Sequence, residues 1–326
     1  MQTTPAHLYL SKEDRKSLLK KNNWKASYEI VLHWLWITFA FALVHFFPNP
    51  ITIIISLFIL GGKQLACAIL MHDAGHRAVF NNKKWNDLIG QWLGAYPIWH
   101  NMHSYREYHY RHHVHTGLPE DPDLLLTRGY PTSSKSMMRK FGRDLSGITG
   151  IKAFFGLTLM HLGYLQYNLG GKIERHSSPP KNIITFGQRF MYHLSGPLFV
   201  NLLLFSILYL IGNPFLYLLW IIAYLTTFQF SLRVRSIAEH SLVKDCTDPF
   251  QNTRTTKANT IEKILFAPYH VNYHAEHHML MAVPSYNLPH MHQLLLKKGF
   301  YEKGILSHGY WSIIKAAAQG QKKGKD

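Results

Sequence analysis

The chain has 326 residues, a formal net charge of +17 and a mean hydropathy of −0.09. Only two cysteines occur, Cys67 and Cys246, and this excludes a disulfide framework and a cysteine-based metal site. The apolar residues are gathered in long runs, so the positive charge is read as membrane topology, and no nucleic-acid partner is expected.

Residues 1–28 form a polar, amphipathic lead. Ser11, followed three positions later by Asp14, predicts a helix start for "KEDRKSLLKK", which we expect at the membrane surface. The first apolar run is longer than the core of a signal peptide, so no secretory signal is predicted.

Four apolar runs each reach the roughly 20 residues that cross a bilayer. They cover residues 29–47, 51–70, 191–211 and 214–232. Only 48–50 and 212–213 separate the members of each pair. The pattern therefore predicts two helical hairpins with four spans.

The positive charges indicate how these hairpins are oriented. Lys and Arg number six before residue 29, fifteen in 71–190 and thirteen in 233–326, and neither hairpin tip carries any. Both termini and the long middle segment are therefore predicted on the cytoplasmic side, in a bacterial cytoplasmic membrane. Within that segment, 88–99 is too short to span, and 151–170 is broken by glycines and read as interfacial or re-entrant.

These features predict an all-α integral membrane protein with two transmembrane hairpins and a helical cytoplasmic cap. The expected divisions are the lead at 1–28, a membrane and cap domain at 29–295, and a basic C-terminal tail at 296–326.

Three histidine clusters stand out, "HDAGH" at 72–76, "HYRHH" at 109–113 and "HAEHH" at 274–278. On a helix, positions i, i+3 and i+4 share a face, so each cluster can aim its rings in one direction. His115 lies on another side of that helix and is excluded. One HxxHH pattern should occur by chance in about one such chain in ten, and two with an HxxxH far more rarely.

The clusters therefore predict a metal site built from imidazoles. His240, two turns beyond the fourth apolar run, projects from the same membrane face and is added as a ninth ligand. The predicted ligands are His72, His76, His109, His112, His113, His240, His274, His277 and His278. Nine imidazoles suit two ions with four or five ligands each, and imidazole alone does not choose among Zn, Cu, Fe and Ni. Glu239 and Glu276 are candidates for carboxylates that orient ligand imidazoles.

The ordered triple box resembles that of the membrane fatty-acid desaturase superfamily, over roughly residues 30–295. "HHVHTGLPEDPDL" and "EHHMLMAVPSYNL" are similar to its bacterial members. The resemblance implies a di-iron centre on the eight box histidines, with His240 as the ligand from the "EH" position. It implies that O₂ and two electrons are used to remove hydrogen from an unactivated methylene, and purified protein can carry zinc in place of iron.

The sequence has no "HPGG" haem motif and no Gly-rich dinucleotide fingerprint. A separate ferredoxin, rubredoxin or cytochrome-type protein is therefore expected to supply electrons. Membrane lipid or another acyl compound is the expected substrate. Residues expected along an apolar slot for the acyl chain are Lys63, Gln64, Trp92, Trp99, Tyr105 and Phe266, although packing or helix pairing also accounts for these side chains.

The main hypothesis is O₂-dependent desaturation of a fatty acyl chain, with no catalytic residue beyond the metal ligands. The boxes do not separate this from hydroxylation or ketolation of an alkane, fatty acid or carotenoid. A third reading is a zinc-dependent membrane lipid hydrolase or a histidine-rich metal-binding receptor, against which nine clustered histidines count. The double-bond position, chain length, acyl carrier and oligomeric state are not given by the sequence.

Overall fold

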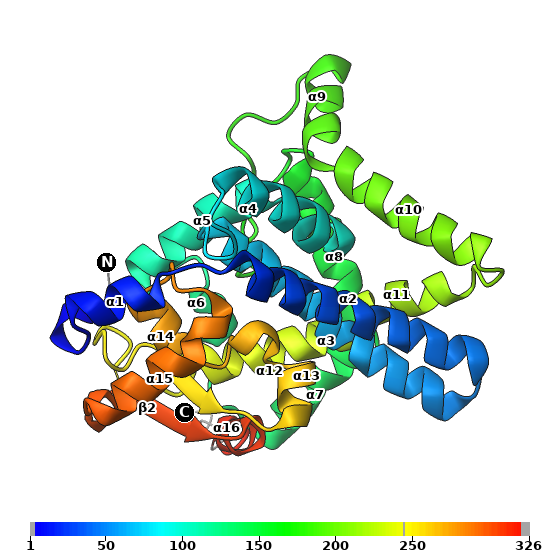
Figure 1. Ribbon diagram of the computed structural model, residues 1–326. Helices are drawn as coiled ribbons and strands as arrows, with labels where there is room; N and C mark the ends of the chain where they lie inside the picture. Colours follow the sequence, from blue (N-terminus) through cyan, green and yellow to red (C-terminus); the bar gives the residue numbers. More distant parts are fainter. Residues whose placement is uncertain (1–3, 244, 321–326) are drawn as a thin grey trace.

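The computed structural model describes residues 4–243 and 245–320, and it is built mainly of helices (Figure 1). After a 3₁₀ turn at Ala6–Leu8, α1 covers Lys12–Leu18. The side chains of Ser11 and Asp14 form both halves of a capping box, which confirms the predicted helix start. Leu10 and Leu18 are buried in a cluster with residues of α15 (Leu288–Lys297). The apolar side of this segment therefore faces the rest of the protein, and not a free membrane surface.

The first hairpin consists of α2 (Asn23–Phe46) and α3 (Pro50–Gly75). Asn49 caps α3, and Pro50 occupies its first turn, where a missing N–H costs nothing. Both helices are long and apolar enough to cross a membrane. α3 continues beyond the predicted end at residue 70, so His72 lies in its last turn.

The second apolar pair is less regular than predicted. Its helices are α9 (Ile183–His193), α10 (Ser195–Leu210), α11 (Leu216–Leu225) and α12 (Thr227–His240). Residues 216–240 form a third candidate span, whereas α9 and α10 meet at a bend of 52°. The 16 residues of α10 extend about 24 Å, less than the roughly 30 Å hydrocarbon core. The described chain thus has three candidate spans, or four if the bent pair counts as one.

A chain of short helices joins the two hairpins. They are α4 (Lys83–Ile89), a π-helix (Gly90–Ala95), a 3₁₀ turn (Tyr96–Ile98), α5 (Met102–His115), α6 (Leu124–Thr127), α7 (Ser134–Leu145) and α8 (Ile148–His161). With 14 residues, α8 is too short to cross a bilayer. This agrees with the prediction that 151–170 does not span.

The segment after α12 folds into small elements packed around its end. They are β1 (Arg254–Lys257), α13 (Thr260–Leu265), α14 (His274–Met279), α15, β2 (Ile305–His308), α16 (Tyr310–Ala317) and 3₁₀ turns at Pro268–His270, Ser285–Asn287 and Phe300–Glu302. β1 and β2 form a parallel pair with Arg254 opposite Ile305. Tyr310 and Ile313 are buried in the largest apolar cluster, so the division expected at residue 295 does not coincide with a break in the structure.

Close packing of α3 against α12 positions the metal-ligand candidates. A Cβ at Gly61 would lie 2.3 Å from Thr227 Oγ1 and 2.7 Å from the Phe228 nitrogen, so only glycine permits this approach. It brings the histidine-bearing ends of both helices together. The tips of α2–α3 and α10–α11 point to the same side of the molecule, and α14, α15 and α16 lie toward the other (Figure 1).

Candidate metal centre

The structure brings all nine predicted histidines together from four helices and the residue that ends α3. They form two groups, and within each group the ligand atoms lie within 4.8 Å of one another. The first contains His72, His76, His109, His113 and His277, and the second His112, His240, His274 and His278. His115 belongs to neither. We call them the five-histidine and four-histidine groups.

The two HxxHH boxes contribute to the groups in opposite ways. On α5, His109 and His113 enter the five-histidine group, whereas His112 enters the other. On α14, His274 and His278 enter the four-histidine group, whereas only His277 enters the first. Viewed down a helix, position i+4 is rotated by about 40° from position i, and position i+3 is rotated by about 60° in the opposite direction. Each box therefore serves both groups.

Nitrogen atoms in the five-histidine group already approach one another as ligands of one ion would. Nε2 of His113 lies 2.9 Å from Nε2 of His109 and 3.2 Å from Nε2 of His277. Nδ1 of His72 donates to Asp73 Oδ1 at 2.7 Å, which leaves its Nε2 as the ligand atom.

The four-histidine group has a fixed set of outer hydrogen bonds. His112 Nδ1 donates to Asp121 Oδ1 at 2.8 Å, and His240 Nδ1 donates to the Asn252 carbonyl at 3.0 Å. Nε2 of His240 lies 2.8 Å from Nε2 of His274. These contacts fix the ring orientation and tautomer, as partners of metal-bound histidines do.

The donor set fits metal ions. Buried Nε2 atoms of His72, His76 and His278 have no hydrogen-bond partner among the described residues, which is costly unless another group binds them. Two nitrogens bound at about 2.1 Å to one ion lie at most about 4.2 Å apart, close to the spread of each group. Each group could therefore hold one ion.

Burial keeps most of these imidazoles neutral. Burial, together with repulsion from the neighbouring histidines, lowers the pKa of His109, His113, His274, His277 and His278 well below 6.5. Burial likewise lowers the pKa of His76 to about 3. Burial also opposes the charged form of His112, but the hydrogen bond to Asp121 and nearby carboxylates raise its pKa. Neutral rings present the lone pair that a metal requires.

The two carboxylates predicted to orient ligand imidazoles lie differently relative to the nine histidines. Glu239 accepts a hydrogen bond from Arg235 at 2.7 Å, and its Oε1 lies 3.5 Å from His274 Nδ1, which has no hydrogen-bond partner among the described residues. Glu276 does not fit that expectation, because its carboxylate points away from the nine histidines. It accepts hydrogen bonds from His292 Nδ1 at 2.6 Å, Tyr301 and Thr255.

Sequence reasoning did not select the partners that the ligands use. Asp73 directly follows His72, and Asp121 lies in the "PEDPD" stretch after the second box. These two partners could have been predicted from the sequence, because each is a carboxylate close in sequence to a ligand histidine. The Asn252 carbonyl carries no such signal, because any residue supplies a backbone oxygen.

Most residues expected along a substrate slot have packing roles. Gln64 is fully buried and donates to the Trp220 carbonyl at 2.8 Å, so it pairs helices. Trp99 packs edge-on against Phe154, at 5.3 Å between ring centres. Trp92 likewise contacts Tyr96 and Phe199, and Phe266 contacts Phe230 and Tyr310. Lys63 lines a separate cavity together with residues of α2 and the α13 region.

Tyr105 is the exception, because it lies beside the histidines. Its ring stacks on His109 with 5.2 Å between centres and an interplanar angle of 10°. It lines a cavity of about 430 Å³ that also contacts His72, His76 and Met281. This cavity gives access to the five-histidine group.

Comparisons with known proteins agree with this site. A family model described as fatty acid desaturase matches residues 45–311. The chain is 28% identical over 276 residues to dihydrorhizobitoxine desaturase of Bradyrhizobium elkanii, covering 82% of this chain and 74% of that protein. It is 25% identical over 244 residues to the sn-1 oleoyl-lipid 12-desaturase of Synechocystis sp., covering 70% and 64%. It is also 26% identical to a fatty acid desaturase 2-like protein of Mus musculus, covering 76% of this chain and 51% of that protein.

The family match covers most of the chain and includes both histidine groups. Together with apolar helices long enough to cross a membrane, it identifies an integral membrane oxidoreductase. The chain belongs to the fatty acid desaturase family.

Proposed function

We propose that this protein introduces a double bond into a fatty acyl chain, carried on a membrane lipid, at two iron ions bound by the nine histidines. The observation that supports this most strongly is the pair of adjacent imidazole groups with unpartnered Nε2 atoms, in a member of this family. The lipid-linked substrate is suggested by the cyanobacterial relative, whose name specifies an oleoyl lipid.

The proposed reaction converts one CH₂–CH₂ unit, O₂, two electrons and two protons into a cis CH=CH unit and two molecules of water. The bound iron would supply O₂ activation and one-electron chemistry. The protein's own residues hold the ligands: Asp73 and Asp121 accept hydrogen bonds from His72 and His112, and burial of the histidines limits their contact with bulk water.

Electrons come, in this proposal, from a separate ferredoxin, rubredoxin or cytochrome-type protein. The distribution of Lys and Arg supports a cytoplasmic position for the site and both termini, with α9–α10 as the fourth span. We further propose that the substrate approaches through the cavity lined by Tyr105 and Met281.

Lipid profiling by mass spectrometry tests this function. The protein is expressed in a bacterium that has no O₂-dependent desaturase, with His277→Ala and His115→Ala as matched variants. The expected product is an acyl chain two mass units lighter, present with the wild type and with His115→Ala and absent with His277→Ala.

Other products would assign the site differently. An acyl product sixteen mass units heavier would mean hydroxylation. An unchanged lipid profile, with O₂-dependent loss of two hydrogens from a substrate that is not a lipid, would contradict the acyl proposal. It would instead favour a substrate like the one named for the Bradyrhizobium relative.

A further inference from the structure

A second cavity, of about 320 Å³, lies between α2, α3 and the α13 region, outside both histidine groups. Its walls combine apolar side chains, including Leu32, Trp36 and Ile264, with Lys63 and His33. Lys63 precedes His72 by nine residues on α3, which is about 14 Å along the helix axis. The cavity is therefore displaced from the metal centre toward the hairpin tip.

Two buried polar side chains on this wall have unused hydrogen-bonding capacity, although His33 Nε2 lies 3.5 Å from Cys67 Sγ. The side chain of Lys63 is 7% exposed and makes no hydrogen bond or ion pair with any described residue. Its ammonium lies 5.7 Å from the centre of the Trp36 ring. His33 is 4% exposed, and its Nδ1 has no hydrogen-bond partner in the described part of the chain. A lysine ammonium that is largely shielded from solvent and has no carboxylate partner favours a bound anion.

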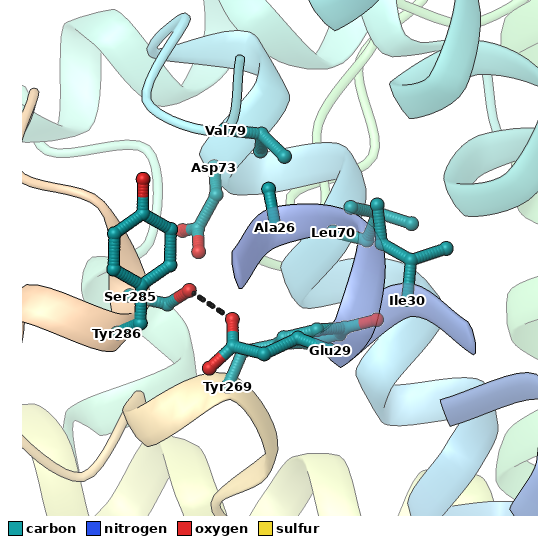
Figure 2. Close-up of a pocket in the computed structure, with 9 residues that line it drawn as sticks. All are labelled: Ala26, Glu29, Ile30, Leu70, Asp73, Val79, Tyr269, Ser285 and Tyr286. Atoms are coloured by element: carbon teal, nitrogen blue, oxygen red, sulfur yellow. Dashed lines mark hydrogen bonds between the residues drawn. The ribbon is translucent and has the colours of Figure 1, made fainter. Parts of the chain in front are cut away.

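The acidic residue on the same wall is engaged elsewhere. Glu29 Oε2 accepts a hydrogen bond from Ser285 at 2.8 Å (Figure 2). Its Oε1 lies 3.8 Å from Nε2 of His270, another residue of the lining. Figure 2 shows this carboxylate turned toward Ser285, beside a neighbouring cavity of about 10 Å³ that would hold roughly one water. Lys263, which is exposed, adds a second positive charge to the lining.

The backbone that closes this cavity is also unusual. Tyr269 and His270 have φ values of 51° and 58°, a left-handed conformation that costs non-glycine residues energy. Both residues line the cavity. Neighbouring packing therefore holds this wall in its shape, and the pocket is built into the fold.

We propose that this cavity binds the anionic head group of a single-chain amphiphile, with the head at Lys63 and His33 and the apolar chain along Leu32, Trp36 and Ile264. A carboxylate and a phosphate share the required chemistry, and the volume lies at the small end of the range for ligand pockets. Part of the lining lies on α2 and α3, two candidate membrane helices, so a ligand could enter from lipid. This site is independent of the reaction proposed above.

Equilibrium binding of radiolabelled hexadecanoate to the purified full chain, in neutral detergent, tests the proposal. Unlabelled hexadecanoate, hexadecyl phosphate and hexadecanol compete, and they differ only in the head group. At least one anion should compete about 10- to 100-fold better than the alcohol, because a charge-assisted contact to Lys63 is lost with the neutral head. The stronger anion identifies the source as a free fatty acid or a phosphate lipid.

Variants assign the effect to Lys63. Lys63→Met should weaken anion binding by a similar factor, and Lys63→Arg should restore part of it. Lys140→Met is the matched control, because Lys140 also lies over an aromatic ring, that of Tyr130, on α7. Circular dichroism and metal content monitor folding, and the head-group comparison on the wild type does not depend on any variant. Equal competition by the alcohol, or unchanged binding by folded Lys63→Met, would overturn the proposal.

Discussion

At the scale of single residues, the site is defined by which imidazole joins which group. Spacing predicted the eight box histidines, because i, i+3 and i+4 positions converge on one side of a helix, and His240 was predicted from its position beyond the fourth apolar run. It did not predict that His112 joins the four-histidine group while the other two histidines of its box join the five-histidine group, or that His277 differs from its box in the reverse way. That division depends on how α5 and α14 face each other, which is a tertiary property that no single box contains.

Among the residues that hydrogen-bond to imidazoles of the four-histidine group, Asp121 should have the largest effect on iron binding. Asp121→Ala removes the acceptor of His112 Nδ1, so the ring is free to rotate, and iron affinity should fall by about 10- to 100-fold. Iron retained after dialysis against a chelator measures this. Glu120→Gln, an exposed neighbour, should retain iron like the wild type. Equal retention by Asp121→Ala would show that this carboxylate does not support the site.

At the scale of the helices, close packing sets the positions of the ligands. The sequence predicted the apolar runs but placed the end of the second at residue 70 and of the fourth at 232. Hydropathy falls where the helices leave the apolar layer, while the hydrogen-bonded helices continue to Gly75 and His240. Gln64 illustrates the same limit, because a polar residue in an apolar run does not reveal whether it faces a substrate or a neighbouring carbonyl.

Gly61 offers a test of this packing. Gly61→Ala places a Cβ 2.3 Å from Thr227 Oγ1 and 2.7 Å from the Phe228 nitrogen, so α12 must move away from α3. We expect a loss of stability of about 1–3 kcal/mol, seen as a lower midpoint of thermal unfolding in detergent. Gly156→Ala on α8, where a Cβ meets nothing within 4 Å, should leave the midpoint unchanged or raise it. Equal midpoints for both variants would contradict the close contact.

At the scale of the whole molecule, the apolar helices and the family match identify an integral membrane protein. The prediction of four spans came from the lengths of the apolar runs. The length of an apolar run does not indicate a bend such as the 52° bend between α9 and α10, where Leu194 separates the two helices. The orientation therefore rests on the distribution of Lys and Arg, and it stays a prediction.

The native cysteines allow a direct test of orientation. Cys246 is exposed and follows α12, whereas Cys67 is buried in α3. A membrane-impermeant maleimide should label the protein in inverted membrane vesicles and not in right-side-out vesicles. Cys246→Ser should abolish the label. Labelling of Cys246 only in right-side-out vesicles would reverse the proposed orientation.

The central claim is that the nine histidines bind two ions side by side. Its most direct test is an anaerobic titration of ferrous ion into the metal-free protein, counting ions bound per chain. We predict saturation at about two ions for the wild type and for His115→Ala, and weakened binding of one of the two in His112→Ala. Saturation of the wild type at a single ion, or equal binding by all three proteins, would contradict the two-site account.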